Sequence, residues 1–327
     1  MISISLCMIV KNEEKVLKRC LESVQGIVDE INIIDTGSTD RTKEIAQLYT
    51  DRIFDFEWID DFAAARNYSF SKATKDYIFW LDADDIITPE DRQNFLGLKS
   101  RIRDTVDSVQ MEYVLSKDAE GRITSSLKRN RLVKRERNFK WIGAVHEYLH
   151  VYGNIIPSDV SITHLSIKLH KTDRNLKIYE KQLENNQEFS PRDLYYYANE
   201  CYEHKMYEKA IDLYRQFLGT EKGWVEDCIA AYEKGAESLL VLGRSAEAEK
   251  FLYESFLYDV PRANLCCKLG YIHLSQNKYH QAIFWYKTAA ESDFERVRST
   301  GAPVNHAYYT WLPHLQLCVC YDRIGKH

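Results

Sequence analysis

The 327-residue sequence lacks the features that define several classes of protein. It contains no apolar run of about 18 residues, so a membrane-spanning helix is not expected. Its eight cysteines form neither a CxxC pair nor a zinc-finger spacing, which predicts reduced, mostly buried thiols. The formal net charge of −5 gives no reason to expect a nucleic-acid partner. Charged residues follow the short apolar stretch 1–10 where a signal peptide would have its cleavage site, so a cytoplasmic protein is expected.

The composition is that of an ordinary globular protein. Hydrophobic residues make up 45% and charged residues 28% of the chain, which allows both a buried core and a polar surface. Because single hydrophobic cores stop growing at roughly 250–300 residues, a chain of this length is expected to hold two domains.

One apolar stretch ends in a cluster of carboxylates. Tyr77–Leu81 is apolar without polar alternation, which is typical of a strand buried on both faces of a parallel sheet. Asp82, Asp84 and Asp85 follow directly. Because ligands of open α/β sheets bind beyond the carboxyl ends of the strands, these acids are expected at the active site.

The carboxylates of Asp82 and Asp84 suit a divalent cation. Small Ala83 lets both face the same way, and Mg²⁺ or Mn²⁺ prefers oxygen ligands that it shares with substrate phosphates. The alternative is that the acidic loop is solvated and merely precedes a helix, which Thr88 and Pro89 are expected to begin as N-cap and first helical residue.

Strand and helix patterns alternate over the first 100 residues. Strands are expected at 2–10, 30–34, 53–56 and 77–81, and helices at 13–24, around 45–48 and from 62 onward. Ser38 or Thr39 is expected to cap the second helix. This order predicts a parallel sheet with right-handed crossovers. No GxGxxG run follows the first strand, which argues against a dehydrogenase.

Four motifs in this region carry a family resemblance. In order and spacing they resemble the family 2 glycosyltransferases of the GT-A fold, and they are Cys7–Glu14, Asp35–Asp40, Ala65–Asn67 and Asp82–Asp84. The resemblance implies a Rossmann-like α/β domain with a mostly parallel mixed sheet, expected over residues 1–170. It also implies an enzyme that uses a nucleotide-sugar donor, commonly a UDP-sugar, with Mn²⁺ or Mg²⁺ as its cofactor.

The resemblance also assigns roles to individual residues. Val10 and Asp35 would contact the nucleobase. Asp82 would reach the ribose and the ion, and Asp84 would hold the ion. A nucleoside diphosphate is a poor leaving group until its charge is neutralised, which a divalent ion does as a Lewis acid. The implied nucleotide-sugar-binding set is Val10, Asp35, Arg66, Asp82 and Ala83.

From residue 105 the pattern becomes antiparallel. Strands are expected at 106–115 and 123–133, with a turn at 117–121 between them. Basic residues flank the second strand and could face the donor phosphates or form the solvated face of a surface hairpin. They are Lys128, Arg129, Arg131, Lys134, Arg135 and Arg137.

The run Phe139–Glu147 contains the candidate base. Displacement at an anomeric carbon needs a group that takes the proton of the acceptor. Related transferases with a Trp-x-Gly-x-x-His-Glu run resemble this segment, which implies Glu147 as the base with His146 beside it. Trp141 would then wall the acceptor site. Without the resemblance, Trp141 is expected in the core and His146 as a hydrogen-bonded partner.

His164 stands at what looks like the end of a strand, Ile162–Leu165. GT-A enzymes often complete the metal site with a histidine at this place. The resemblance therefore implies His164 as a third ligand beside Asp82 and Asp84. The alternative is a structural histidine.

The rest of the chain has a different pattern. A polar helical connector is expected at 171–190, followed by an all-α domain at 191–327 with three similar segments. Ala210, Ala248 and Ala282 align in these segments and lie 38 and 34 residues apart. The second spacing is the tetratricopeptide period, and small residues stand twelve positions before each alanine, so the segments resemble tetratricopeptide repeats. Leu317–Lys326 resembles the first helix of a fourth repeat, so the array is expected to end within a repeat.

Two kinds of partner fit such an array. Its concave surface could bind a peptide or protein acceptor, and its last helices could pair in a homodimer. The sequence as a whole predicts a metal-dependent, inverting glycosyltransferase. The alternatives are a nucleotidyltransferase, which usually has a glycine-rich basic loop where this chain has Lys11–Glu14, and a non-catalytic nucleotide-binding scaffold whose array binds other proteins.

Overall fold

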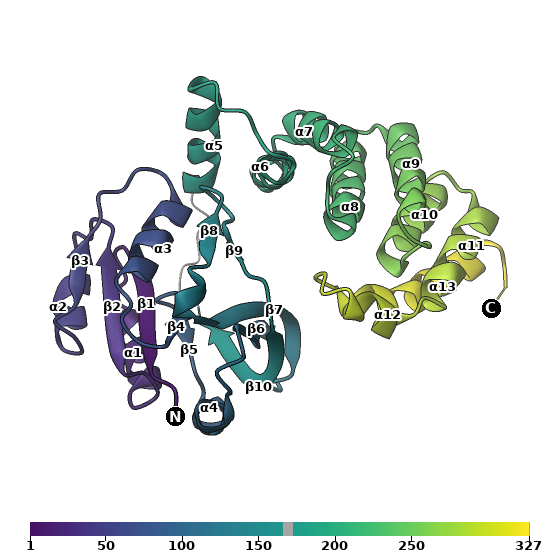
Figure 1. The fold of residues 1–327 in the computed structure, drawn as a ribbon. Helices are drawn as coiled ribbons and strands as arrows, with labels where there is room; N and C mark the ends of the chain where they lie inside the picture. The colour runs from purple at the N-terminus through teal and green to yellow at the C-terminus, as the bar shows by residue number, and fades with distance from the viewer. Residues whose placement is uncertain (166–172, 327) are drawn as a thin grey trace. The chain divides into compact units, whose positions relative to one another are not determined.

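The structure is a computed structural model that describes residues 1–165 and 173–326 (Figure 1). The chain divides into two compact units, one up to residue 172 and one from Asp173 onward. The first two residues of the expected connector, 171 and 172, lie outside the described residues. No helix in the described ranges has the length and apolarity that crossing a bilayer requires.

The first unit contains a mixed sheet. Within the described residues its strands follow the order β3-β2-β1-β4-β7-β6-β10-β5. Neighbours from β3 to β4 are parallel, β7 is antiparallel to β4 and β6, and β10 is parallel to β6. The strands are β1 (Ile4–Val10), β2 (Glu30–Asp35), β3 (Ile53–Asp55), β4 (Tyr77–Trp80), β5 (Asp85–Ile86), β6 (Ser108–Lys117), β7 (Ile123–Lys134) and β10 (Ile155–His164).

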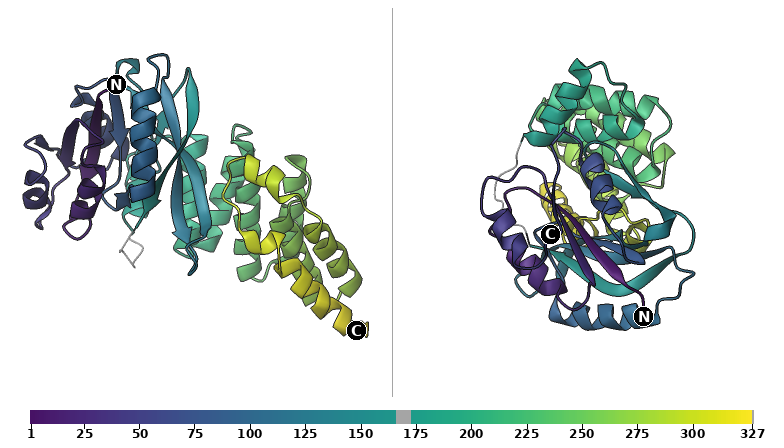
Figure 2. Two further views of the ribbon diagram at one scale, coloured as in Figure 1. Left: turned by 90° about the horizontal axis from the view of Figure 1, so that it is seen from below. Right: turned by 60° about the vertical axis from the view of Figure 1, so that its left-hand side comes forward.

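Helices cover both faces of the sheet. They are α1 (Leu17–Val24), α2 (Thr42–Gln47), α3 (Phe62–Ser71) and α4 (Pro89–Arg101), with a short 3-10 turn η1 (Arg135–Arg137) and a small ribbon of β8 (Lys140–Ile142) and β9 (Tyr148–His150). Figure 2 shows α4 lying along the sheet. Alternate residues of β1 serve the two faces: Leu6 and Met8 join the core under α1 and α4, and Cys7 joins the opposite core beside Phe70 of α3.

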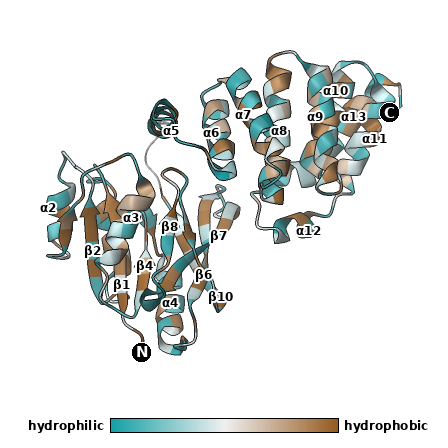
Figure 3. Ribbon diagram, turned by 45° about the horizontal axis from the view of Figure 1, so that its top comes forward, coloured by the Kyte–Doolittle hydropathy of each residue, from teal (hydrophilic) through white to brown (hydrophobic). Residues whose placement is uncertain are grey.

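The central strands β1 and β4 consist mostly of apolar residues, and Figure 3 shows β1 largely in brown. This composition follows from their burial on both faces. The parallel register places Val10 of β1 beside Asp35 of β2, and Cys7 beside Trp80 of β4. At the far edge His164 of β10 pairs with Asp85 of β5. The polar residues that follow β1, β2 and β4 therefore meet at one edge of the sheet with the end of β10.

Two local predictions about the motif loops are wrong. The first helix begins at Leu17 rather than Glu13. Asn12 has a left-handed φ of 55°, and the N–H groups of Asn12 and Glu13 donate to the hydroxyls of Ser38, in the loop after β2, and of Thr42, at the start of α2. The helix α2 begins at Thr42 with no side-chain cap, because Ser38 and Thr39 bond to Asn12 instead. The two motifs are thus tied to each other.

The N-cap predicted before the fourth helix is confirmed. The Thr88 hydroxyl accepts a hydrogen bond from the Asp91 N–H at 3.2 Å, Pro89 stands in the first turn, and Glu90 and Asp91 lie near the positive end of the helix dipole. The cap starts α4 directly after the acidic loop.

The second unit is helical throughout its described part. Its helices are α5 (Arg174–Glu184), α6 (Pro191–Glu203), α7 (Tyr207–Gly219), α8 (Val225–Val241), α9 (Ser245–Glu254), α10 (Ala263–Ser275), α11 (Tyr279–Ala290), α12 (Phe294–Ser299) and α13 (Leu312–Arg323), with the 3-10 turns η2 (Ser255–Leu257) and η3 (His306–Tyr309). The pairs α6–α7, α8–α9 and α10–α11 pack against each other, as the three similar segments predict.

The small residues of the repeats lie where paired helices meet. The alanines at 198, 210, 236, 248 and 282 are fully buried. A Cβ placed on Gly270 of α10 would stand 2.7 Å from the ring of Tyr286 of α11, so only glycine allows this close approach. The predicted fold, a mostly parallel α/β domain followed by an all-α repeat array, is confirmed.

Candidate active site

A tight turn presents the acidic loop at the carboxyl end of β4. The Asp85 N–H donates to the Asp82 carbonyl at 3.1 Å, and the Asp82 N–H donates to the Asp85 carboxylate at the same distance. Because Tyr77–Leu81 is buried, the loop is anchored at its origin. The short strand β5 then pairs with β10, which brings His164 to the loop.

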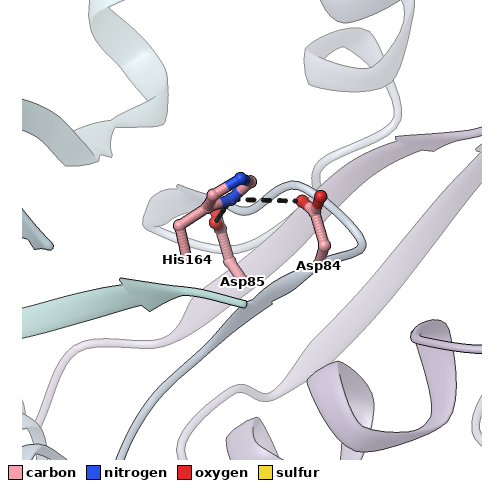
Figure 4. A group of neighbouring side chains, drawn as sticks. All are labelled: Asp84, Asp85 and His164. Carbon is pink, nitrogen blue, oxygen red and sulfur yellow. Dashed lines mark hydrogen bonds and ion pairs between the residues drawn. The ribbon is translucent and has the colours of Figure 1, made fainter. Parts of the chain in front are cut away.

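Asp84, Asp85 and His164 form a group that could hold a cation (Figure 4). Their ligand atoms lie within 4.8 Å of one another. The Nδ1 atom of His164 is 3.5 Å from Asp84 Oδ1 and 3.4 Å from Asp85 Oδ1. Carboxylate oxygens with one imidazole nitrogen are ligands that suit Mn²⁺ or Mg²⁺, so the residues fit the implied cofactor.

The electrostatics of this group follow from its burial and its mutual contacts. Burial raises the pKa of the Asp84 carboxyl, opposed by His164 and assisted by Asp82 and Asp85. The hydrogen bond to Asp85 raises the pKa of the His164 imidazole, assisted by the charge of Asp84 and opposed by burial. In the described part of the chain, Asp84 has no lysine or arginine partner. It is therefore the carboxylate whose charge is left for a ligand.

The structure groups Asp85, rather than the predicted Asp82, with Asp84 and His164. The Asp82 carboxylate instead accepts a hydrogen bond from the Nη2 atom of Arg66 at 2.7 Å. Burial would raise the pKa of Asp82, but Arg66 and Arg131 outweigh it and hold the pKa at about 2. A direct bond from Asp82 to the ion stays a prediction.

Arg66 joins two residues that the sequence assigned to different roles. Its Nε atom donates to Glu147 Oε1 at 2.6 Å, and its Nη2 atom donates to Asp82 Oδ1. The guanidinium lies over the rings of Trp80 and Trp141, 5.0 and 4.7 Å from their centroids. Burial opposes the charge, but Asp82 and Glu147 raise the pKa of Arg66 further above its usual value. The candidate base and the donor side of the site thus share one cation.

Trp141 lies inside the packing rather than on an open wall. Only 4% of it is exposed, and its ring meets Trp80 edge to face at 4.7 Å. The Asn67 side chain bonds both the N–H and the carbonyl of Trp141 at 3.0 Å, which explains why asparagine follows arginine in the third motif. The buried position agrees with the expectation of a core tryptophan, and a contact with the acceptor stays a prediction.

The loop before β9 has the backbone shape that aims Glu147. Gly143 has a φ of 98°, which glycine adopts without strain, and His146 has a φ of 50°, which is uncommon for a residue with a side chain. His146 directly precedes Glu147 in this bend, and the backbone conformation of the bend fixes the position of His146. A catalytic role for His146 stays a prediction.

Three residues predicted to bind the nucleotide sugar are buried near the carboxyl edge of the sheet. Asp35 is 1% exposed and accepts the N–H groups of Gly37 and Ser38. The Val10 side chain is in the core, and its carbonyl accepts both the N–H and the hydroxyl of Thr36. Ala83 is buried as well. Their contacts with a nucleotide stay predictions.

Sequence reasoning missed Arg131 and Tyr113. Arg131 was one of six basic residues expected at phosphates or in solvent, yet its side chain is fully buried and pairs with Asp85 at 3.1 Å. Its guanidinium lies between the rings of Trp80 and Tyr113, 3.8 and 4.3 Å from their centroids. The one sequence signal is that Arg131 directly precedes the apolar pair Leu132 and Val133 inside a strand.

These features define an α/β domain with a candidate metal site at the carboxyl edge of its sheet. Residues 5–151 match the family model described as Glycosyl transferase family 2. The predicted resemblance is confirmed.

Two relatives match the chain over different lengths. The SPbeta prophage-derived glycosyltransferase SunS of Bacillus subtilis is 28% identical over 237 residues, covering 67% of this chain and 54% of SunS. A TPR repeat-containing protein of Synechococcus elongatus is 49% identical over 85 residues, covering 26% of this chain and 21% of that protein. The chain thus spans about half the length of one relative and about a fifth of the other.

Solved structures give weaker likenesses. Glucosyl-3-phosphoglycerate synthase from Mycobacterium tuberculosis, in complex with Mn²⁺ and UDP-glucose, has a TM-score of 0.38 at 14% identity and covers 58% of this chain and 81% of its own. TarS 1-349 of S. aureus has a TM-score of 0.36 at 11% identity, covering 89% of this chain and 93% of its own. TM-scores this low add nothing to the fold described above.

Proposed function

We propose that this chain transfers a sugar from a nucleotide-sugar donor, most simply a UDP-sugar, to an acceptor in a metal-dependent, inverting reaction. The observation that carries the proposal is the family 2 domain at residues 5–151, whose acidic loop gathers Asp84, Asp85 and His164 at the carboxyl edge of the sheet. Open α/β sheets bind their ligands at that edge.

The ion would be held by Asp84 and His164. When bound, a divalent ion supplies Lewis-acid neutralisation of the diphosphate leaving group. Asp84 is the carboxylate of the group without a lysine or arginine partner in the described residues, so its charge would be available to the ion. Asp35, Asp82, Ala83 and the end of β1 would bind the nucleoside.

Glu147 would take the proton of the acceptor. Its Oε1 atom is held by Arg66, and its other oxygen accepts no hydrogen bond from the part of the chain that the structure describes. The second carboxylate oxygen would then be available to the acceptor, and the bond to Arg66 would fix its orientation. An acceptor thiol, with an ordinary pKa of about 8.5, would need less help from Glu147 than a hydroxyl would.

The helical repeats would recruit a peptide or protein acceptor. The support is architectural, because stacked helix pairs form extended surfaces that bind polypeptides. A homodimer through the last helices is a second use of the same array.

Calorimetric binding of UDP, GDP and dTDP, each with and without Mn²⁺, tests the proposal. Binding of one nucleotide that depends on Mn²⁺ is expected, and Asp84→Asn should remove that dependence because the amide carries no charge. The matched control is Asp118→Asn in the hairpin turn between β6 and β7, where Asp118 bonds to Arg122. Absence of binding by all three nucleotides would contradict the proposal, and slow hydrolysis of a sugar donor would rule out a scaffold.

A further inference from the structure

A set of contacting side chains from neighbouring strands supports the candidate metal group, and three of them, Arg131, Tyr113 and Asp85, are buried. Arg131, Tyr113, His164 and Asp85 come from β7, β6, β10 and β5, which are consecutive strands of the sheet. Each strand contributes one side chain to the chain of contacts. Strand neighbours hold such side chains at fixed separations, so the arrangement is set by the sheet and not by a mobile loop.

Asp85 is saturated by protein partners. One carboxylate oxygen accepts the Asp82 N–H and pairs with Arg131, both at 3.1 Å, and the other accepts the Tyr113 hydroxyl at 2.9 Å. The side chains of Asp85 and Arg131 are both fully buried. The charge of Asp85 is therefore already balanced by Arg131. Because both carboxylate oxygens already accept hydrogen bonds, Asp85 is a poor ligand for an ion.

The direction of each proton follows from these contacts. An ionised carboxylate can only accept, so the single hydroxyl proton of Tyr113 goes to Asp85. The phenol oxygen then has only lone pairs to offer, and it lies 3.0 Å from His164 Nδ1. That distance is shorter than the distances from Nδ1 to the carboxylates of Asp85 and Asp84, so Nδ1 carries a proton and donates it to Tyr113.

The other ring nitrogen is left with its lone pair. In Figure 4 the second nitrogen of His164 lies outside the marked contact with Asp84. A metal-binding histidine that donates from one nitrogen to a second partner is held in orientation and binds the ion through the other nitrogen.

We propose that Tyr113 and Asp85 are positioning residues that fix His164 with Nε2 as the metal-binding atom. Asp85 stays outside the coordination of the ion, with Arg131 as its charge partner. This inference rests on the proposed metal site and deepens it, because it names the donor atom and separates the two adjacent aspartates into a ligand, Asp84, and a support, Asp85.

The first test reads the tautomer without any metal. Long-range ¹H–¹⁵N spectra of histidine-labelled protein, taken at a pH above the pKa of the imidazole, distinguish the two neutral forms, and His164→Gln assigns the signal. We expect His164 to carry its proton on Nδ1. A proton on Nε2 would overturn the inference whether or not the protein is a glycosyltransferase.

The second test measures Mn²⁺ affinity in the presence of UDP by calorimetry. Tyr113→Phe keeps the ring against Arg131 and removes the bridging oxygen, so affinity should fall about 10-fold or more, as for other residues that orient metal ligands. The matched control is Tyr77→Phe, because Tyr77 is also buried in the sheet and its hydroxyl bonds only to backbone carbonyls, those of Val106 and Arg103. It should bind Mn²⁺ as the unmodified protein does.

The outcomes separate the two claims. If Asp84→Asn abolishes Mn²⁺ binding and Tyr113→Phe leaves it unchanged, the positioning role is wrong and the metal site stands. If Asp84→Asn and His164→Gln both bind Mn²⁺ normally, the proposed metal site itself is wrong. Asp85→Asn would leave Arg131 buried without its charge partner and could unfold the domain, which is why Tyr113 is the position tested.

Discussion

A single guanidinium organises the candidate site at the scale of one residue. Arg66 donates to Asp82 with one nitrogen and to Glu147 with another, and two tryptophan rings flank it. Its planar fork can serve two carboxylates at once, which the ammonium of lysine cannot do with the same geometry. The positions of Asp82 and Glu147 relative to each other are therefore fixed by one side chain.

Glu147→Gln tests the base without changing the shape of the site. The amide keeps an oxygen that can accept from Arg66 Nε but cannot take a proton, so kcat should fall about 10²- to 10⁴-fold. The affinity for UDP with Mn²⁺ should stay within a few-fold, and Glu120→Gln in the exposed hairpin turn is the control. Unchanged turnover would remove Glu147 as the base, and a parallel loss of nucleotide affinity would make it a support for Arg66.

Glu30 gives a prediction about stability and pH. Its carboxylate accepts hydrogen bonds from Ser5, Thr74 and Asn32 between β1, β2 and the start of β4. Burial would raise the pKa of Glu30, but these hydrogen bonds outweigh it and lower the pKa from 4.5 to about 2. Between these two pH values the unfolded chain binds more protons than the folded one, so folding is destabilised as the pH falls.

Glu30→Gln should therefore lower the free energy of unfolding at neutral pH by roughly 2–3 kcal/mol, in line with a shift of that size. The difference from the unmodified protein should be constant above about pH 5 and shrink as the pH falls toward 2. Urea unfolding at a series of pH values measures it. A difference that does not change with pH would mean that the effect comes from packing and not from the charge.

Close helix contacts decide the stability of the repeats at the scale of elements. Gly270→Ala would place a methyl group 2.7 Å from the buried ring of Tyr286. Overpacking costs about 1–3 kcal/mol, and the better helix propensity of alanine offsets roughly 1 kcal/mol of it. We therefore expect a net loss of up to about 2 kcal/mol in the second unit.

Gly219→Ala is the matched control, because a methyl group there meets no atom within 4 Å and should stabilise α7 slightly. Thermal or urea unfolding followed by circular dichroism compares the two variants. Equal stability of both would show that α10 and α11 can move apart without cost, and would contradict the close contact of the two helices.

The whole molecule consists of two units with separate cores. Hydrogen exchange of the intact chain should therefore locate the nucleotide site in the first unit. UDP with Mn²⁺ should slow exchange in peptides that cover residues 9–12, 35–40, 82–85 and 143–147, and should leave α8–α11 unchanged. Asp84→Asn should lose this protection. Protection confined to the helical unit would contradict the assignment of the site.

Much of the architecture could be predicted from local pattern. The strands and helices of the first unit, the cap at Thr88 and the three helix pairs follow from hydrophobic periodicity, capping chemistry and a repeat of 34 residues, all of which are properties of neighbouring positions. The motifs themselves also lie close in sequence to the strand ends that present them. Local interactions are sufficient to specify features of this kind.

Pairing across long sequence separations could not be predicted in the same way. Arg131 and Asp85 are 46 residues apart, and Arg66 and Glu147 are 81 apart, so no periodicity links them. Asp82 and Asp85 look equivalent in the sequence, yet one meets Arg66 and the other Arg131. The start of the first helix could not be predicted either, because it depends on the N–H groups of Asn12 and Glu13 donating to the hydroxyls of Ser38 and Thr42.

The sequence by itself determined the α/β domain, the helical repeats and the edge of the sheet at which the acids lie, because burial pattern and turn chemistry act between near neighbours. Only the tertiary structure decided which acid lacks an arginine partner, which ones pair with Arg66 and Arg131, and which cation holds the candidate base. Charges in a buried site are settled by partners that the strand order brings together.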